Sequence, residues 1–239
     1  SPSPSPPSSN TTRRINDVIT RHVLPKYSVI LSDEDPIPLY GLKTLSTILE
    51  HSPQFVSAIH RSNLTRIFFD FLQLEHSNNN IHNIKIIHRI VLCTDVRPSF
   101  IYDMGVVDKV NAVVAYAFDN AVESFFEPLL ELFISLLSLP HERGTQDERQ
   151  MVHSQNEKLL SQCFVLAHLA QHTDAAVSDK ALSCLLLQLH DYAGIDRTVF
   201  SSPDHLQRFV STLQTELSSS VLTKEAFLSI VSKAAARIS

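Results

Sequence analysis

The chain has 239 residues, of which 44% are hydrophobic and 19% charged, and its formal net charge is -5. That length holds one or two ordinary domains, or about five helical repeats of the 40 to 47 residues that armadillo and HEAT units use. Acids and bases are well mixed, and no block of Lys or Arg is long enough to follow a phosphate backbone, so no nucleic-acid partner is expected. The apolar stretches are too short to cross a bilayer and the amino end carries no signal pattern, so we expect no membrane partner and a cytoplasmic location.

The composition also favours helices over sheets. There are only four glycines and no tryptophan, and the apolar residues gather in runs that polar segments separate. The three cysteines, Cys93, Cys163 and Cys184, stand singly in apolar stretches with no CxxC spacing. Reduced thiols in a core explain them better than disulfides or zinc, and they indicate a reducing compartment. We predict an all-α protein with almost no strand.

The amino-terminal segment, residues 1–10, reads SPSPSPPSSN. Alternating proline holds the backbone extended and serine buries nothing, so this segment is predicted to be a linker or tail. A helical-repeat domain is predicted for residues 11–239. Its first helix begins at Thr11 or Thr12 and ends at Leu24, because Pro25 follows.

Three helices are predicted next, over residues 38–51, 53–61 and 63–72. Pro38 lies in the first turn of the first, Pro53 opens the second, and Asn63 is predicted to cap the third. A long, a short and a further helix in this order resemble one armadillo repeat.

The same order recurs 45 residues later, over residues 81–93, 98–105 and 106–118. The leucines at 39, 42 and 45 return as isoleucines at 84, 87 and 90, then as Leu129, Leu132 and Ser135. The pair Pro53 and Phe55 returns as Pro98 and Phe100. Stacked repeats leave such self-similarity because each unit hides its apolar face only against the next. We therefore predict an α-solenoid of armadillo/HEAT-like repeats, about five units in all.

The third unit is predicted over residues 120–139, with Pro128 either kinking one helix or starting a second. Residues 141–150, HERGTQDERQ, depart from the repeat spacing, and one long helix is predicted from 147 to 172. Asp174 or Ser178 is expected to cap a helix through Leu189. Two final helices are predicted to begin at Ser202 and Thr223.

Two groups of residues are candidates for binding a partner. Asp119, Glu123, Glu127 and Glu131 recur every four residues, and they would form an acidic ridge if one helix continued across Pro128. A solvated outer face is the commoner explanation of such a pattern. Phe68, Phe69 and Phe71 cannot all face one side of a helix, so Phe69 or Phe71 is predicted to be a partly exposed interface anchor. The alternative is that all three rings pack between neighbouring repeats.

Signals for catalysis are poor. GxGxxG, GxxxxGK[ST], GxSxG and HExxH are all absent, and no cofactor is expected. His168 and His172 lie one helical turn apart near Cys163, but further zinc ligands at a suitable spacing are lacking. His88 and Arg89 resemble a kinase catalytic loop only faintly, because Ile90 occupies the position of the catalytic Asp.

Residues 35–55, DPIPLYGLKTLSTILEHSPQF, and 101–110, IYDMGVVDKV, resemble the carboxy-terminal armadillo/HEAT region of the fourth Unc-51-like kinase family, pseudokinases related to the Fused kinases. The resemblance covers residues 35–140 and continues beyond them as repeat pattern. In that family a kinase-like domain precedes the repeats, and none of its residues is present here. The resemblance implies a scaffold that works with a Fused-type kinase at cilia or other microtubule arrays, as similar plant proteins act at the microtubules of dividing cells. It transfers no individual binding residue.

The sequence therefore predicts a non-catalytic protein-interaction scaffold that presents a groove to an extended or helical segment of another protein. A generic armadillo/HEAT adaptor outside the kinase family would show the same period. A metal-dependent enzyme is the distant alternative, and it requires His168, His172 and an acid around one pocket.

Overall fold

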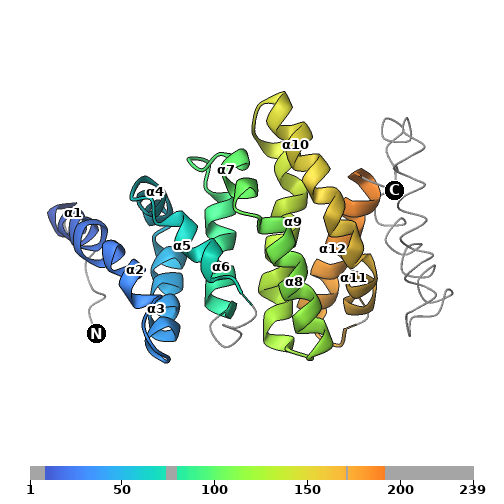
Figure 1. Ribbon diagram of the computed structural model, residues 1–239, viewed down its shortest axis with the longest axis horizontal. Helices are drawn as coiled ribbons and strands as arrows, with labels where there is room; N and C mark the ends of the chain where they lie inside the picture. Colours follow the sequence, from blue (N-terminus) through green and yellow to red (C-terminus); the bar gives the residue numbers. More distant parts are fainter. Residues whose placement is uncertain (1–8, 74–79, 171, 192–239) are drawn as a thin grey trace, which may run out of the picture.

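The computed structural model describes residues 9–73, 80–170 and 172–191, and these residues form helices without a strand (Figure 1). The all-α prediction is confirmed for this part of the chain. The helices predicted from Ser202 and Thr223, and most of the predicted linker, lie outside the described residues. None of the described helices combines the length and apolarity that a bilayer crossing requires.

The amino-terminal helical segment is longer than predicted. It begins at Ser9, two residues early, and Pro25 does not end it. Pro25 is the second residue of a short 3-10 turn, a position whose N–H has no helical acceptor, so proline is tolerated there. The segment comprises α1 Ser9–Val18, the π-helix η1 Ile19–Val23, the 3-10 helix η2 Leu24–Lys26 and α2 Tyr27–Ile30.

Three successive units follow, each with a long, a short and a third helix. The first is α3 Ile37–His51, α4 Gln54–Arg61 and α5 Thr65–Phe71; the second is α6 Asn80–Leu92, α7 Pro98–Asp103 and α8 Val106–Asp119. The 3-10 helix η4 Glu123–Phe125 leads into the third unit, which is α9 Phe126–Glu142, α10 Gln146–Asn156, the 3-10 helix η5 Glu157–Gln162 and α11 Cys163–Leu169. The last described helix is α12 Ala175–Asp191.

The first helices of the units pack side by side in chain order, α3 on α6, α6 on α9 and α9 on α12. We call this row the helical ladder. The helices α4, α7 and α10 lie along one edge of the molecule (Figure 1). The arrangement is that of an α-solenoid, as the repeat spacing predicted.

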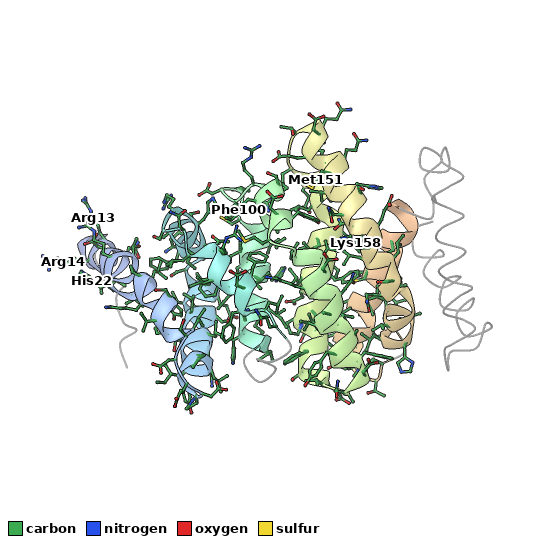
Figure 2. The ribbon with its side chains drawn as sticks, viewed as in Figure 1. Arg13, Arg14, His22, Phe100, Met151 and Lys158 are labelled. Atoms are coloured by element: carbon green, nitrogen blue, oxygen red, sulfur yellow. The ribbon has the colours of Figure 1, made fainter. Side chains whose placement is uncertain are left out.

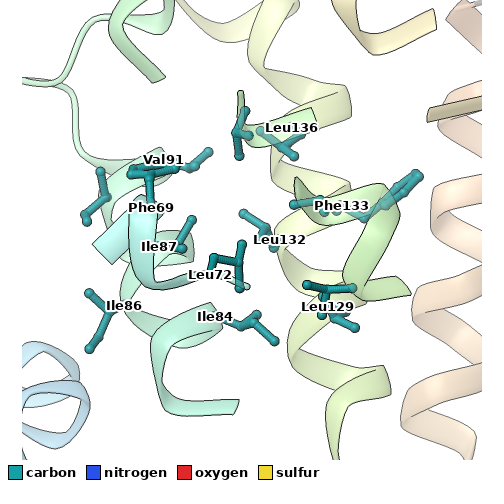
Figure 3. Packing of buried hydrophobic residues seen from close by; sticks show 14 of the residues in the cluster. Phe69, Leu72, Ile84, Ile86, Ile87, Val91, Leu129, Leu132, Phe133 and Leu136 are labelled. Atoms are coloured by element: carbon teal, nitrogen blue, oxygen red, sulfur yellow. The ribbon is translucent and has the colours of Figure 1, made fainter. Parts of the chain in front are cut away.

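The repeated aliphatic residues form the spine of the ladder. Figure 3 shows Ile84 and Ile87 of α6 on the side that faces Leu129 and Leu132 of α9. Each of these four side chains is at most 3% exposed. The spacing of 45 residues therefore marks one buried position repeated in successive units. Two members of the pattern differ: Leu39 and Ser135 are only partly buried.

Three predicted helix boundaries are wrong. Asn63 does not cap α5; its φ of 57° is left-handed, and it lies in the turn that ends α4. The helix of the third unit begins at Phe126 and not at Asn120, and Pro128 lies in its first turn, which is the alternative in which Pro128 starts a second helix. The helix predicted over residues 147–172 is divided into α10, η5 and α11.

Pro140 lies inside α9, which therefore runs three residues beyond the predicted end at Leu139. Proline has no N–H, so the carbonyl of Leu136 loses its helical donor. Asn156 replaces that donor from the end of α10, with its Nδ2 2.8 Å from the Leu136 oxygen. The hydroxyl of Tyr102 donates in turn to Asn156 Oδ1 at 2.7 Å. This buried group ties α7, α9 and α10 together, and burial raises the pKa of Tyr102.

The loop between α9 and α10 is fixed to the preceding unit. Arg143 donates hydrogen bonds to the carbonyls of Val91 and Cys93 at the end of α6. Glu148, three residues after the Thr145 cap of α10, accepts from Ser99 at 2.8 Å and from Arg97 at 3.1 Å. The hydrogen bonds from Ser99 and from the backbone N–H of Thr145, together with the charge of Arg97, lower the pKa of Glu148 to about 2. Residues 141–150, which depart from the repeat spacing, thus hold the second and third units in register.

A second link joins these units on the side of α8. Lys158 of η5, labelled in Figure 2, lies 3.2 Å from a carboxylate oxygen of Asp108 in α8. Arg13, Arg14 and His22 are labelled in the same figure at the opposite, amino-terminal end of the molecule.

Candidate partner-binding groove

The ladder carries a hollow of about 390 Å³ between three successive repeat helices. We call it the ladder hollow. Eight of its ten lining residues are polar or charged, which suits a segment of another protein better than an apolar small molecule. The lining residues are Ser46 and Glu50 of α3, Ile81, Lys85, His88 and Arg89 of α6, Ser124 of η4, and Glu127, Pro128 and Glu131 of α9.

The helical period places these side chains on one face. On α6 the buried residues Ile84 and Ile87 point into the core; Lys85 follows Ile84, and His88 and Arg89 follow Ile87 along the helix. A period of 3.6 residues puts Lys85 and Arg89 one turn apart. The same amphipathicity that packs the ladder therefore turns its polar face toward the hollow.

His88 is fixed between two helices of the ladder. Its Nε2 lies 2.9 Å from the hydroxyl of Ser135, and its Nδ1 lies 3.9 Å from Glu131 Oε2. Burial lowers the pKa of His88, and the carboxylate of Glu131 opposes that effect only in part. His88 is therefore neutral at neutral pH and contributes hydrogen bonding, not charge, to this wall.

The wall of the hollow that α9 forms is acidic, and a lysine of α12 partly neutralises it. Lys180 lies 2.6 Å from Glu127 and 3.4 Å from Glu131. The hydrogen bond to Glu127 is the main cause that raises the pKa of Lys180. These two ion pairs join α9 to α12. Because one lysine pairs with two carboxylates, the α9 wall keeps a net negative charge.

The predicted acidic ridge does not exist as a single helical face. Asp119 ends α8, Glu123 begins η4, and only Glu127 and Glu131 share a helix. Ala121, with a φ of 52°, turns the chain between them. The structure brings Glu127 and Glu131 together in the ladder hollow and leaves Asp119 and Glu123 out of its lining.

The predicted aromatic anchor is also wrong. Phe69 is fully buried and Phe71 is 6% exposed, so neither ring is presented at the surface. Phe68 is likewise fully buried. All three rings pack in the core, as the alternative explanation held.

His168 and His172 do not converge on one site. The His168 ring packs edge-on against Phe118 at 5.1 Å, and the His172 ring packs against Phe126 at 5.8 Å. Within the described residues, no three His, Cys, Asp or Glu side chains form a group that could hold a metal ion. The side chain of Cys163 lies outside the described part.

Sequence reasoning missed most of the ladder hollow, including Ser46, Glu50 and Lys85. A signal was available, because polar residues alternate with the repeated aliphatics on α3, α6 and α9. His88 and Arg89, which the faint kinase resemblance singled out, lie on the half-exposed side of α6.

Comparisons with known proteins agree with the repeat architecture. Residues 3–57 match the family model of the HEAT repeats of serine/threonine-protein kinase ULK4-like proteins, and residues 63–181 match that of the RUNKEL ARM-repeat domain. Two curated relatives are similar in sequence. Serine/threonine-protein kinase RUNKEL of Arabidopsis thaliana is 27% identical over 132 residues, which are 54% of this chain and 10% of that protein. Serine/threonine-protein kinase ULK4 of Mus musculus is 24% identical over 230 residues, covering 83% of this chain.

The chain corresponds to a small part of each relative, since the match to ULK4 covers 17% of the mouse protein. No solved structure matches the chain. The two family models meet in the ladder, one over α3 and the other over α6, α9 and the start of α12. The chain is therefore an armadillo/HEAT repeat region similar to those of the ULK4 and RUNKEL kinases.

Proposed function

We propose that this chain is a non-catalytic interaction module that binds a segment of another protein in the ladder hollow. The hollow supports this proposal most directly, because it is polar and spans helices from three units. A surface built from repeated helices offers successive side chains to an extended or helical segment.

The family resemblance supports a proposal for the biological setting. We infer that the chain is the repeat module of a Fused/Unc-51-like pseudokinase, with the repeat domain beginning at α1 instead of at residue 11. It acts with a Fused-type kinase at cilia or microtubules, and its location is the cytoplasm or cytoskeleton. The similarity to the ULK4 and RUNKEL kinases supports this setting over a generic adaptor.

Affinity purification from ciliated cells, followed by peptide identification, tests the proposal. The chain is compared with Ser46→Tyr, which fills the ladder hollow, and with Thr44→Tyr, which adds the same ring at an exposed position of α3 outside the lining. We expect a Fused-type kinase or axonemal proteins with the unchanged chain and with Thr44→Tyr, and their loss with Ser46→Tyr.

Two other results would change the proposal. Recovery of only unrelated proteins, lost with Ser46→Tyr, would favour the generic adaptor. Equal recovery of partners by both variants would contradict binding in the ladder hollow.

A further inference from the structure

The α6 wall of the ladder hollow carries cations that no acid of the described structure neutralises. Lys85 is exposed and Arg89 half-buried, and both line the hollow. Neither forms an ion pair within the described part of the chain. Their i, i+4 spacing places their Cβ atoms about 6 Å apart on one face of the helix.

One more cation, Lys43, extends this positive region toward α3. Lys43 of α3 is exposed and has no ion pair among the described residues. His82 of α6 lies near both lysines, since the charges of Lys85 and Lys43 add to the burial that lowers its pKa. This lowered pKa leaves His82 uncharged at neutral pH. We call the three cations Lys43, Lys85 and Arg89 the basic strip.

The acids around the hollow do not cancel the basic strip. Glu50 of α3 is in the lining without an ion pair in the described residues. Glu127 and Glu131 belong to the opposite wall, where Lys180 of α12 already pairs with them. The hollow is therefore polarised, with excess positive charge on the α3 and α6 side and excess negative charge on the α9 side.

We propose that the segment bound in the ladder hollow is an acidic one, whose Asp or Glu side chains pair with Lys85 and Arg89. This inference rests on the proposed function and specifies the chemistry of the partner. Arginine binds a carboxylate through two parallel hydrogen bonds, and lysine adds a point charge one turn away. Such complementarity raises the association rate and excludes basic segments from this wall.

The α9 wall narrows the choice of occupant further. A nucleic acid presents a negative charge at every nucleotide, so Glu127 and Glu131 would repel the part of the strand that lies against them. A protein segment can place its acids on the basic strip and uncharged or basic residues against α9. The polarised hollow thus fits a segment of mixed sequence with acids along one side.

Selection from a phage-displayed library of random 12-residue peptides tests the inference on the whole 239-residue chain. We expect the enriched peptides to be rich in Asp and Glu. The best of them, labelled with fluorescein, is then titrated by fluorescence anisotropy with the unchanged chain and with variants. Neutralising the strip in Lys85→Gln/Arg89→Gln should weaken binding at least tenfold, and raising the salt concentration should weaken binding to the unchanged chain.

A matched control removes two cations elsewhere. Arg13→Gln/Arg14→Gln has the same net charge, but its changes lie at the amino-terminal end (Figure 2). Its affinity should stay within twofold of the unchanged chain, and thermal melting followed by circular dichroism verifies that each variant is folded.

Several results would overturn the inference. Enrichment of neutral or basic peptides, or of none, would do so, as would equal weakening by both double variants. If single-stranded DNA or a phosphopeptide bound more tightly than the acidic peptide, the proposed acidic protein segment would be the wrong class of partner. Selection of basic peptides whose binding is lost in Ser46→Tyr would show that the partner segment is not acidic. It would still support binding in the ladder hollow.

Discussion

At the scale of single residues, the repeated aliphatic positions decide whether the ladder holds together. Ile87 of α6 is fully buried and faces Leu132 of α9 (Figure 3). Two positions away, Lys85 is exposed and lines the ladder hollow. Neighbouring residues of one helix therefore either pack in the core or line the hollow.

Replacing Ile87 by Ala should destabilise the chain by about 2 to 5 kcal/mol, because the lost methyl and methylene groups leave a cavity that the ladder cannot close. Urea denaturation followed by circular dichroism measures the change. Lys85→Ala, on the exposed side of the same helix, should change the unfolding free energy by less than about 0.5 kcal/mol. Equal effects of the two substitutions would show that the core is assigned wrongly.

Glu148 should give the stability a defined pH dependence. Its pKa is lowered from 4.5 to about 2 in the folded chain. A carboxyl group with a lowered folded pKa stabilises the fold above its unfolded pKa, and that contribution is lost as the pH falls toward 2. Glu148→Gln should therefore be less stable than the unchanged chain at pH 6, with a smaller difference at pH 3. Urea denaturation of both proteins at the two pH values measures the difference in unfolding free energy. The same difference at pH 6 and pH 3 would refute the lowered pKa of Glu148.

At the scale of elements, the helices could be predicted from periodicity, but several of their ends could not. The repeat of Leu42, Ile87 and Leu132 located the ladder because buried positions recur with the unit. Proline was less informative. Pro25, Pro128 and Pro140 all lie within helical segments, since proline needs only a first turn or a donor that replaces its missing N–H.

The candidate site was predicted only in part, for a related reason. Glu127 and Glu131 are in the ladder hollow, but the rest of it comes from α3, α6 and η4. Sequence spacing reports neighbours along one helix, whereas the hollow depends on which faces of separate helices meet. The exposure of Phe69 was mispredicted likewise, because α5 is covered on more than one side.

Asn156, whose side chain replaces the N–H that Pro140 lacks, can be tested directly. Asn156→Ala should cost about 1 to 3 kcal/mol, because it removes the hydrogen bonds of Asn156 and leaves the buried Leu136 carbonyl and Tyr102 hydroxyl with only the 3.3 Å hydrogen bond between them. Gln150→Ala, at an exposed position of the same helix, is the control and should be nearly neutral. Thermal or urea unfolding of both variants checks this, and a neutral Asn156→Ala would mean that the buried group does not support α9.

At the scale of the whole molecule, the stacking of repeats creates the candidate binding surface. In a solenoid each unit contacts mainly its neighbours, so a hollow that spans α3, α6 and α9 exists only when three units are in register. The Arg143 and Glu148 contacts hold two of those units together. The shape of the ladder hollow, and with it the proposed binding, therefore depends on the alignment of the repeats.

The central claim is that the ladder hollow is the face that binds a partner protein. Chemical acetylation of lysines, read by mass spectrometry with and without the partner recovered by affinity purification, tests it most directly. We predict that bound partner protects Lys43 and Lys85, whereas the exposed Lys26 and Lys158 react as before. Unchanged labelling of Lys85 together with protection of Lys26 or Lys158 would contradict the claim.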